Sequence, residues 1–265
     1  MSQALEDSRI ESESPLASEL RFEPAHRRVR ALAGNVVVAD SRHVMLMRDP
    51  KYLPVYYFPR GDVRMDLLTP TDHHTHAPSK GTASYWTLHV GGRTIENAAW
   101  GYMEPKAGAP DIKDYVAFYW DMMDAWYEED DEVFVHARDP YHRVDVLNSS
   151  RHVRVVIAGE TVAETRRPRL LFETSLPTRY YIPKLDVRMD LFEPSDTTSR
   201  CPYKGIASYW SFRSGETFQK DIVWSYPFPI LECSRIENLM CFFNERVEAI
   251  YVDDEKVPVP KTPWS

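Results

Sequence analysis

The pentapeptide Val63-Arg64-Met65-Asp66-Leu67 occurs twice in the chain, because Val187-Arg188-Met189-Asp190-Leu191 repeats it without change 124 residues later. The same offset aligns residues 80–86 (KGTASYW) with residues 204–210 (KGIASYW). One register without gaps that covers both segments indicates a tandem duplication. The sequence therefore predicts two copies of a single structural unit.

The duplication sets the expected domain boundaries. We place the first repeat at residues 27–141, the second at 150–265, and a linker at 142–149, since each repeat has the size of an independent domain. Residues 1–26 are acidic and poor in apolar side chains, which predicts a disordered tail. Two copies are too few for a solenoid, so we expect a pseudo-two-fold pairing of the two repeats.

Apolar and aromatic residues follow a period of two in each repeat, which is typical of strands. Trp86, Leu88 and Val90 share one face of an extended segment, and we expect that face in the core. Residues 250–257 predict a hairpin that turns at adjacent acidic residues. Residues 117–126 are the only helix candidate, and their aromatic content leaves it ambiguous. The expected fold is mainly β, with two repeated compact β-sheet domains and little helix.

Composition excludes several classes of protein. No run approaches the roughly 20 apolar residues that cross a bilayer, so we expect no membrane association. The net charge of -8 provides no positive field for a nucleic-acid backbone. The first residues lack the basic and apolar segments of a signal peptide, and three cysteines are too few for a disulfide framework. These features predict a cytoplasmic protein in a reducing compartment.

Arg64 with Asp66, and Arg188 with Asp190, form the first candidate site. On a strand, residues two apart point to the same face, so each pair lines a shared polar surface. An arginine fork beside a carboxylate suits the binding of a carboxylate or a phosphate. The alternative is a structural ion pair on a solvated face.

Lys80 and Lys204 form the second candidate, because each precedes a glycine in a proline-containing loop that leads into the Trp-bearing strand. A lysine in such a loop can bind a ligand anion or, when desolvated, act as a base or nucleophile. It can also simply solubilise the end of a strand. Both interpretations remain open.

Cys201 lies beside Arg200 and Lys204, whose charges favour a reactive thiolate, although most single cysteines are structural. His73, His74 and His76 are spaced closely enough to suggest metal ligands, but Cys and Glu residues at a recognised spacing are missing. We therefore assign no metal, and a solvated polar loop is the alternative. The sequence also lacks the glycine-rich motifs of nucleotide sites, so no cofactor is expected.

Aromatic residues recur at the same offset and are candidates for the walls of a ligand pocket, as well as for the core. In the second repeat the pocket candidates are Tyr209 and Trp224.

The ordered string of motifs in the second repeat resembles the family described as domain of unknown function 427. The motifs are residues 179–183 (RYYIP), 201–205 (CPYKG), 207–210 (ASYW) and 224–227 (WSYP), and the resemblance covers both repeats. The first repeat departs from it at Ala77, where the family pattern has cysteine. The resemblance implies a compact, mainly β domain often found in tandem. It also carries a nucleotidyltransferase label, but the Gly-Ser turn and Asp-x-Asp pair of that chemistry are missing here.

Two functions are consistent with these features. The first is a small-molecule enzyme or sensor that binds an anionic metabolite in the second repeat, where Arg188 anchors the anion, Asp190 orients Arg188, and Lys204 or Cys201 supplies reactivity. The alternative is a non-catalytic protein-interaction module whose duplicated polar face binds a protein partner. The sequence leaves open whether the protein is an enzyme.

Overall fold

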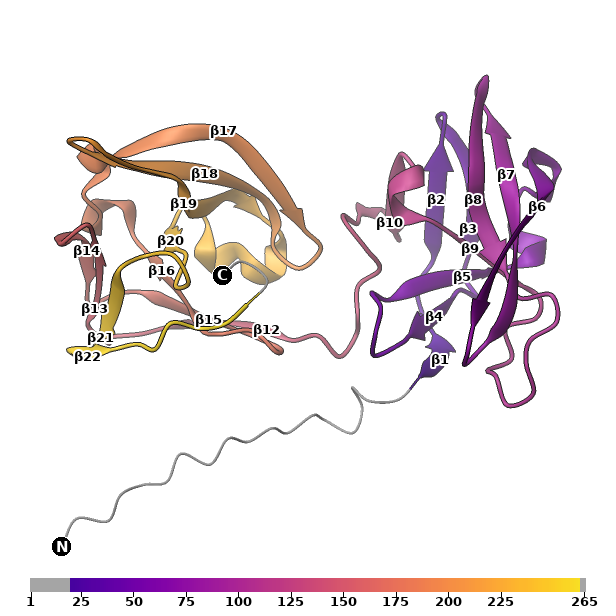
Figure 1. Cartoon of the computed structure of the whole chain (residues 1–265), viewed down its shortest axis with the longest axis horizontal. Coiled ribbons are helices and arrows are strands. Elements are labelled where there is room, and N and C mark those ends of the chain that lie inside the picture. Colours follow the sequence, from indigo (N-terminus) through magenta and orange to yellow (C-terminus); the bar gives the residue numbers. More distant parts are fainter. Residues whose placement is uncertain (1–19, 263–265) are drawn as a thin grey trace, which may run out of the picture. The chain divides into compact units, whose positions relative to one another are not determined.

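The structure is a computed structural model that describes residues 20–262, and the chain divides into two units after Ala137 (Figure 1). Strands dominate both units, as the sequence predicts, and the helices of the described part are short 3-10 turns. No helix within residues 20–262 is long and apolar enough to span a membrane. Residues 1–19, most of the expected tail, lie outside the described residues.

Each unit contains a seven-stranded and a four-stranded antiparallel sheet. In the first unit the larger sheet has the order β1-β4-β5-β9-β8-β7-β6 and the smaller one β11-β10-β2-β3. Their bounds are β1 (Arg21–Pro24), β2 (Val29–Ala33), β3 (Val36–Ser41), β4 (Met45–Arg48), β5 (Val55–Pro59), β6 (Leu68–Ala77), β7 (Gly81–Val90), β8 (Arg93–Gly101), β9 (Tyr115–Phe118), β10 (Ala125–Glu128) and β11 (Asp131–Glu132).

The second unit repeats this topology strand for strand, with orders β12-β15-β16-β20-β19-β18-β17 and β14-β13-β21-β22. Its strands are β12 (Val144–Asn148), β13 (Val153–Ile157), β14 (Glu160–Thr165), β15 (Arg169–Glu173), β16 (Arg179–Ile182), β17 (Phe192–Cys201), β18 (Gly205–Ser214), β19 (Thr217–Pro229), β20 (Met240–Phe242), β21 (Ala249–Val252) and β22 (Glu255–Lys256). The duplication seen in the sequence is therefore a duplication of the fold.

The repeats begin earlier than positions 27 and 150. Strand β1 pairs with β4, and its counterpart β12 pairs with β15, so both belong to the larger sheets. Strand β12 lies inside the segment 142–149 that we interpreted as a linker. Both strands are short and lie at the edge of a sheet, where a strand can form with few alternating apolar residues. This is why the apolar pattern of the sequence did not indicate them.

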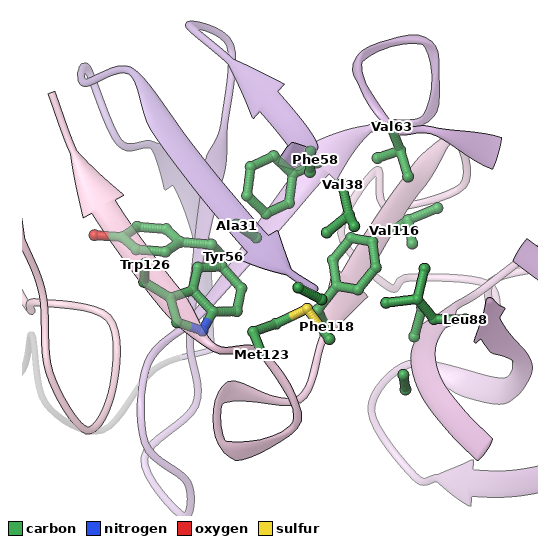
Figure 2. Close-up of a cluster of buried hydrophobic side chains, with 14 of the residues drawn as sticks. Ala31, Val38, Tyr56, Phe58, Val63, Leu88, Val116, Phe118, Met123 and Trp126 are labelled. Atoms are coloured by element: carbon green, nitrogen blue, oxygen red, sulfur yellow. The ribbon is translucent and has the colours of Figure 1, made fainter. Parts of the chain in front are cut away.

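The main core of the first unit lies between its two sheets (Figure 2). Ala31 and Val38 come from the smaller sheet, and Phe58, Leu88 and Phe118 from the larger one. Full burial of a side chain such as Phe58 contributes about 2–3 kcal/mol. The Trp-bearing face of β7 is confirmed as part of this core, since Trp86, Leu88 and Val90 are all buried.

The opposite face of each seven-stranded sheet is also covered, and we call it the aromatic face. Alternation along β5 places Tyr56 and Phe58 in the main core and Tyr57 on this second face. In the first unit the face is built from Met47, Tyr57, Ala83, Tyr85, Tyr102, Ile112 and Ala117. In the second unit it includes Leu171, Tyr181, Ala207, Trp224, Tyr226, Cys233 and Cys241.

The helix considered for residues 117–126 does not form. The segment contains the end of β9, the 3-10 turn η3 (Trp120–Met122) and the start of β10. Val116 and Phe118 point into the main core and Ala117 to the aromatic face, which is strand alternation. The terminal hairpin is confirmed: β21 turns into β22 at Asp253 and Asp254, whose φ angles of 53° and 68° fit a tight hairpin turn.

Candidate functional site

A pocket of about 1270 Å³ opens on the first unit. It reaches from the aromatic face to the start of β5 and to residues 135 and 136, just before the end of the unit. Six of the aromatic residues that line it are Tyr57, Tyr85, Trp100, Tyr102, Tyr119 and Trp120. A pocket of this size and lining suits a small organic ligand.

Lys80 and Asp49 form a buried ion pair in the wall of this pocket. Lys80 Nζ lies 2.9 Å from Asp49 Oδ2, and the two side chains are 9% and 15% exposed. Gly81, which follows the lysine, has a φ of +101°, and a Cβ there would lie 3.0 Å from the backbone nitrogen of Lys106. The glycine is therefore needed for the tight turn that places Lys80.

Three tyrosines, Tyr57, Tyr85 and Tyr102, line the same pocket as this pair. Tyr57 accepts a hydrogen bond from Trp100 Nε1 at 3.2 Å, and the Tyr85 hydroxyl lies 2.8 Å from Thr75 Oγ1. The Tyr102 side chain is buried, yet its hydroxyl has no hydrogen-bond partner within residues 20–262. Burial, together with Tyr85 and the nearby Asp49 charge, raises the pKa of Tyr102 to about 12. Tyr102 is thus a neutral hydrogen-bond donor near pH 7.

The aromatic face of the second unit holds a matching pair, Lys204 and Glu173. Lys204 Nζ lies 2.6 Å and 2.5 Å from the two Glu173 carboxylate oxygens. His142 adds a third member, with Nε2 3.0 Å from Glu173 Oε1, and its ring stacks on Tyr203 at 4.1 Å between centroids. Lys204 is thus held in a buried cluster of charged and polar groups.

A second buried ion pair distinguishes this unit. The guanidinium of Arg179 donates to both oxygens of Glu245 at 2.8 Å and 2.7 Å, and their side chains are 6% and 0% exposed. The same guanidinium lies 5.4 Å from the centre of the Trp224 ring. Thr262 also donates to Glu245 at 2.6 Å. In the first unit the offset places Val55 at the position of Arg179 and Asp121 at that of Glu245.

The arginine pairs of the repeated pentapeptide lie elsewhere. Arg64 and Asp66 form a two-fold hydrogen-bonded pair at 2.8 Å and 2.7 Å, and Arg188 and Asp190 do the same at 3.0 Å and 2.7 Å. All four side chains are more than half exposed, and none lines the first-unit pocket.

The strand geometry expected for the pentapeptide is wrong. Its last three residues form 3-10 turns, η2 (Met65–Leu67) and η5 (Met189–Leu191), in which each arginine precedes the turn and reaches its own aspartate. A short turn with alternating apolar and polar residues has the same pattern as a strand.

The remaining candidates are dispersed. Tyr209 is half-buried, with its hydroxyl 2.7 Å from Ser199 Oγ, and Trp224 is buried and donates from Nε1 to Tyr181 at 3.1 Å. Cys201 is a partly exposed free thiol at the end of β17. His76 lines the first-unit pocket.

The other two histidines of the first repeat are engaged in local contacts. The His73 ring packs edge-on against Tyr85, with 4.5 Å between ring centroids, and His74 Nδ1 lies 3.1 Å from the Ala83 carbonyl. Within the described chain, no three His, Cys, Asp or Glu side chains form a group that could hold a metal ion.

The sequence indicated both lysines but not their acidic partners. Asp49 and Glu173 are also related by the offset of 124 residues, so an acidic residue at the same place in both repeats was an available signal. Their polar neighbours in sequence gave no reason to expect burial. The Arg179–Glu245 pair was not indicated, because its partners are 66 residues apart and meet only through strand pairing.

The buried acids of the second unit predict acid sensitivity. Burial alone would raise the pKa of Glu173, but His142 and Lys204 lower it below its ordinary value of 4.5, and Arg179 likewise lowers that of Glu245. A carboxyl whose folded pKa is depressed stabilises the fold fully above pH 4.5, and this stability is lost as the pH falls through the folded pKa.

We expect the free energy of unfolding, measured by urea denaturation, to fall steeply below about pH 4.5. Glu173→Gln should be less stable at pH 7 and show a shallower fall. Glu232→Gln removes a 59% exposed carboxyl and serves as the control with an unchanged slope. If the unfolding free energy of Glu173→Gln fell with pH as steeply as that of the parent, Glu173 would not be the source of the acid sensitivity.

The family comparison agrees with the duplicated fold. The family model described as domain of unknown function (DUF427) matches residues 21–129 and again residues 145–253. Both matches begin at the paired edge strands β1 and β12, upstream of positions 27 and 150. A comparison with curated proteins found no match. With most of its length covered by two matches of the same model, the chain belongs to the DUF427 family and carries the domain in two copies.

Proposed function

We propose that the first unit binds a small organic molecule with a flat apolar body and a carbonyl or carboxylate head group. The observation that carries this proposal is the Tyr102 side chain, which lines an aromatic pocket beside the Lys80–Asp49 pair and whose hydroxyl has no hydrogen-bond partner within the described chain. A hydroxyl that faces a pocket without a protein partner is available to donate a hydrogen bond to an acceptor of a ligand.

The donors of the pocket favour an acceptor as head group. The Lys80 ammonium donates one hydrogen bond to Asp49 at 2.9 Å, and its second contact, to Ser79 Oγ, is long at 3.4 Å. The ammonium therefore retains capacity for a ligand oxygen, and Tyr102 supplies a neutral hydroxyl close to the same carboxylate. Trp100 and Tyr119 offer ring faces for the apolar body.

The proposal places the ligand in the first unit and not in the second. Arg179 and Glu245 occupy the corresponding positions of the second unit with their own buried side chains. Lys204 is engaged by Glu173 and His142 there. The proposal is therefore a binding role for the first unit, with the second unit as its structural counterpart.

Tyr102→Phe tests the proposal, and Tyr226→Phe is its matched control at the same position of the second unit. Benzoate should bind the parent chain in isothermal titration calorimetry. Loss of one hydrogen bond to a charged acceptor removes about 1.5–3 kcal/mol, so Tyr102→Phe should weaken binding roughly 10- to 100-fold. Tyr226→Phe should bind like the parent. Absence of benzoate binding, or equal weakening in both variants, would refute the proposal.

A further inference from the structure

The two units hold two versions of one site, and their shared parts correspond closely. The tryptophan Nε1 donates to a tyrosine hydroxyl at 3.2 Å in the first unit and 3.1 Å in the second. The rings of Trp100 and Tyr119 lie 4.5 Å apart, as do those of Trp224 and Phe243. Because these aromatic residues are arranged alike in the two units, a different residue at an equivalent position changes which groups occupy the site.

The second unit fills its site with a planar cation of its own. The Arg179 guanidinium lies against the Trp224 ring and makes two parallel hydrogen bonds to the Glu245 carboxylate. An aromatic face together with a carboxylate is a favourable environment for a guanidinium, which stacks on rings and pairs with carboxylates through two N–H groups.

The first unit keeps the aromatic face and the acid but has no cation at this place. Val55 stands at the position of Arg179, and Val55, Trp100 and Asp121 all line the pocket. The Asp121 carboxylate is exposed and makes no ion pair with any residue that the structure describes. The volume that the shorter valine leaves is thus part of the open pocket.

We infer that the first unit binds a planar cationic group of its ligand, a guanidinium or an amidinium, between the Trp100 ring and Asp121. The ligand group takes the place that Arg179 takes in the second unit. This inference rests on the proposed binding function of the same pocket. Together with the acceptor recognised by Lys80 and Tyr102, it identifies the ligand class as a flat molecule with a planar cation and a carbonyl or carboxylate group.

Three probes with one phenyl body separate this inference from the proposed function: benzamidinium, neutral benzamide and anionic benzoate. We expect benzamidinium to bind the full chain at least tenfold more tightly than benzamide in isothermal titration calorimetry. Asp121→Asn should abolish this preference and leave benzoate binding in place. Asp131→Asn removes the same charge at β11, outside the pocket lining, and should keep the preference.

The three-probe titration can overturn the cationic subsite alone or the whole binding proposal. Benzamidinium that binds no more tightly than benzamide, or a preference that survives Asp121→Asn, overturns the cationic subsite. If the cationic subsite is overturned but benzoate still binds, the proposed binding function stands without that subsite. If none of the three probes binds the parent chain, both the proposed function and this inference fail.

Discussion

Arg179→Val is expected to lower the free energy of unfolding of the second unit by about 3–5 kcal/mol. The variant installs the residue that the first unit has at this position, but it leaves the Glu245 side chain, 0% exposed, without its guanidinium partner. A buried carboxylate that loses its counter-charge retains its full desolvation cost. Urea denaturation followed by tryptophan fluorescence measures the change.

Two comparisons make this result specific. Arg179→Met with Glu245→Met removes both charges and should recover most of the lost stability, because apolar side chains often replace a buried ion pair without loss. Arg143→Val removes an arginine that is 79% exposed and should change the stability by less than 1 kcal/mol. An Arg179→Val variant as stable as Arg143→Val would mean that the buried pair does not hold the second unit together.

The reverse exchange should close the pocket of the first unit. Val55→Arg combined with Asp121→Glu introduces the pair of the second unit, and we expect binding of benzoate and benzamidinium to weaken at least 100-fold. The new guanidinium would lie on the Trp100 ring and pair with the introduced carboxylate, as Arg179 does with Trp224 and Glu245. Calorimetric titration with each probe measures the loss.

The matched control makes the same chemical exchanges away from the pocket. Val37 on β3 is 37% exposed and Asp131 belongs to β11, so Val37→Arg with Asp131→Glu should bind both probes like the parent. Retention of binding in the Val55→Arg and Asp121→Glu variant would show that the probes bind outside the space that corresponds to Arg179.

The sequence predicted the parts of the fold that repetition and alternation encode. The offset of 124 residues and the period of two along β7 were enough for the duplication, the β class and the core role of Trp86. The edge strands β1 and β12 were missed, because an edge strand with one buried neighbour needs few apolar residues. The pentapeptide turn was missed because a single 3-10 turn and a short strand have the same apolar pattern.

The candidate site was predicted only in part, for a related reason. Lys80 and Lys204 stood out because each precedes a glycine in the duplicated register. Whether a site is open depends on side chains that meet through strand pairing, such as Arg179 and Glu245, and their contact leaves no local pattern in the sequence. Val55 stands where the second repeat has Arg179, and in the sequence this is one difference among many.

We propose that, among the residues the structure describes, the first unit holds an open ligand site and the second unit holds a copy of that site filled by Arg179. The most direct test is the stoichiometry of benzamidinium binding to the full chain by isothermal titration calorimetry, repeated with the Val55→Arg and Asp121→Glu variant. We predict one molecule bound per parent chain and none per variant chain. Two molecules per parent chain, or one molecule bound equally by the variant, would contradict the account.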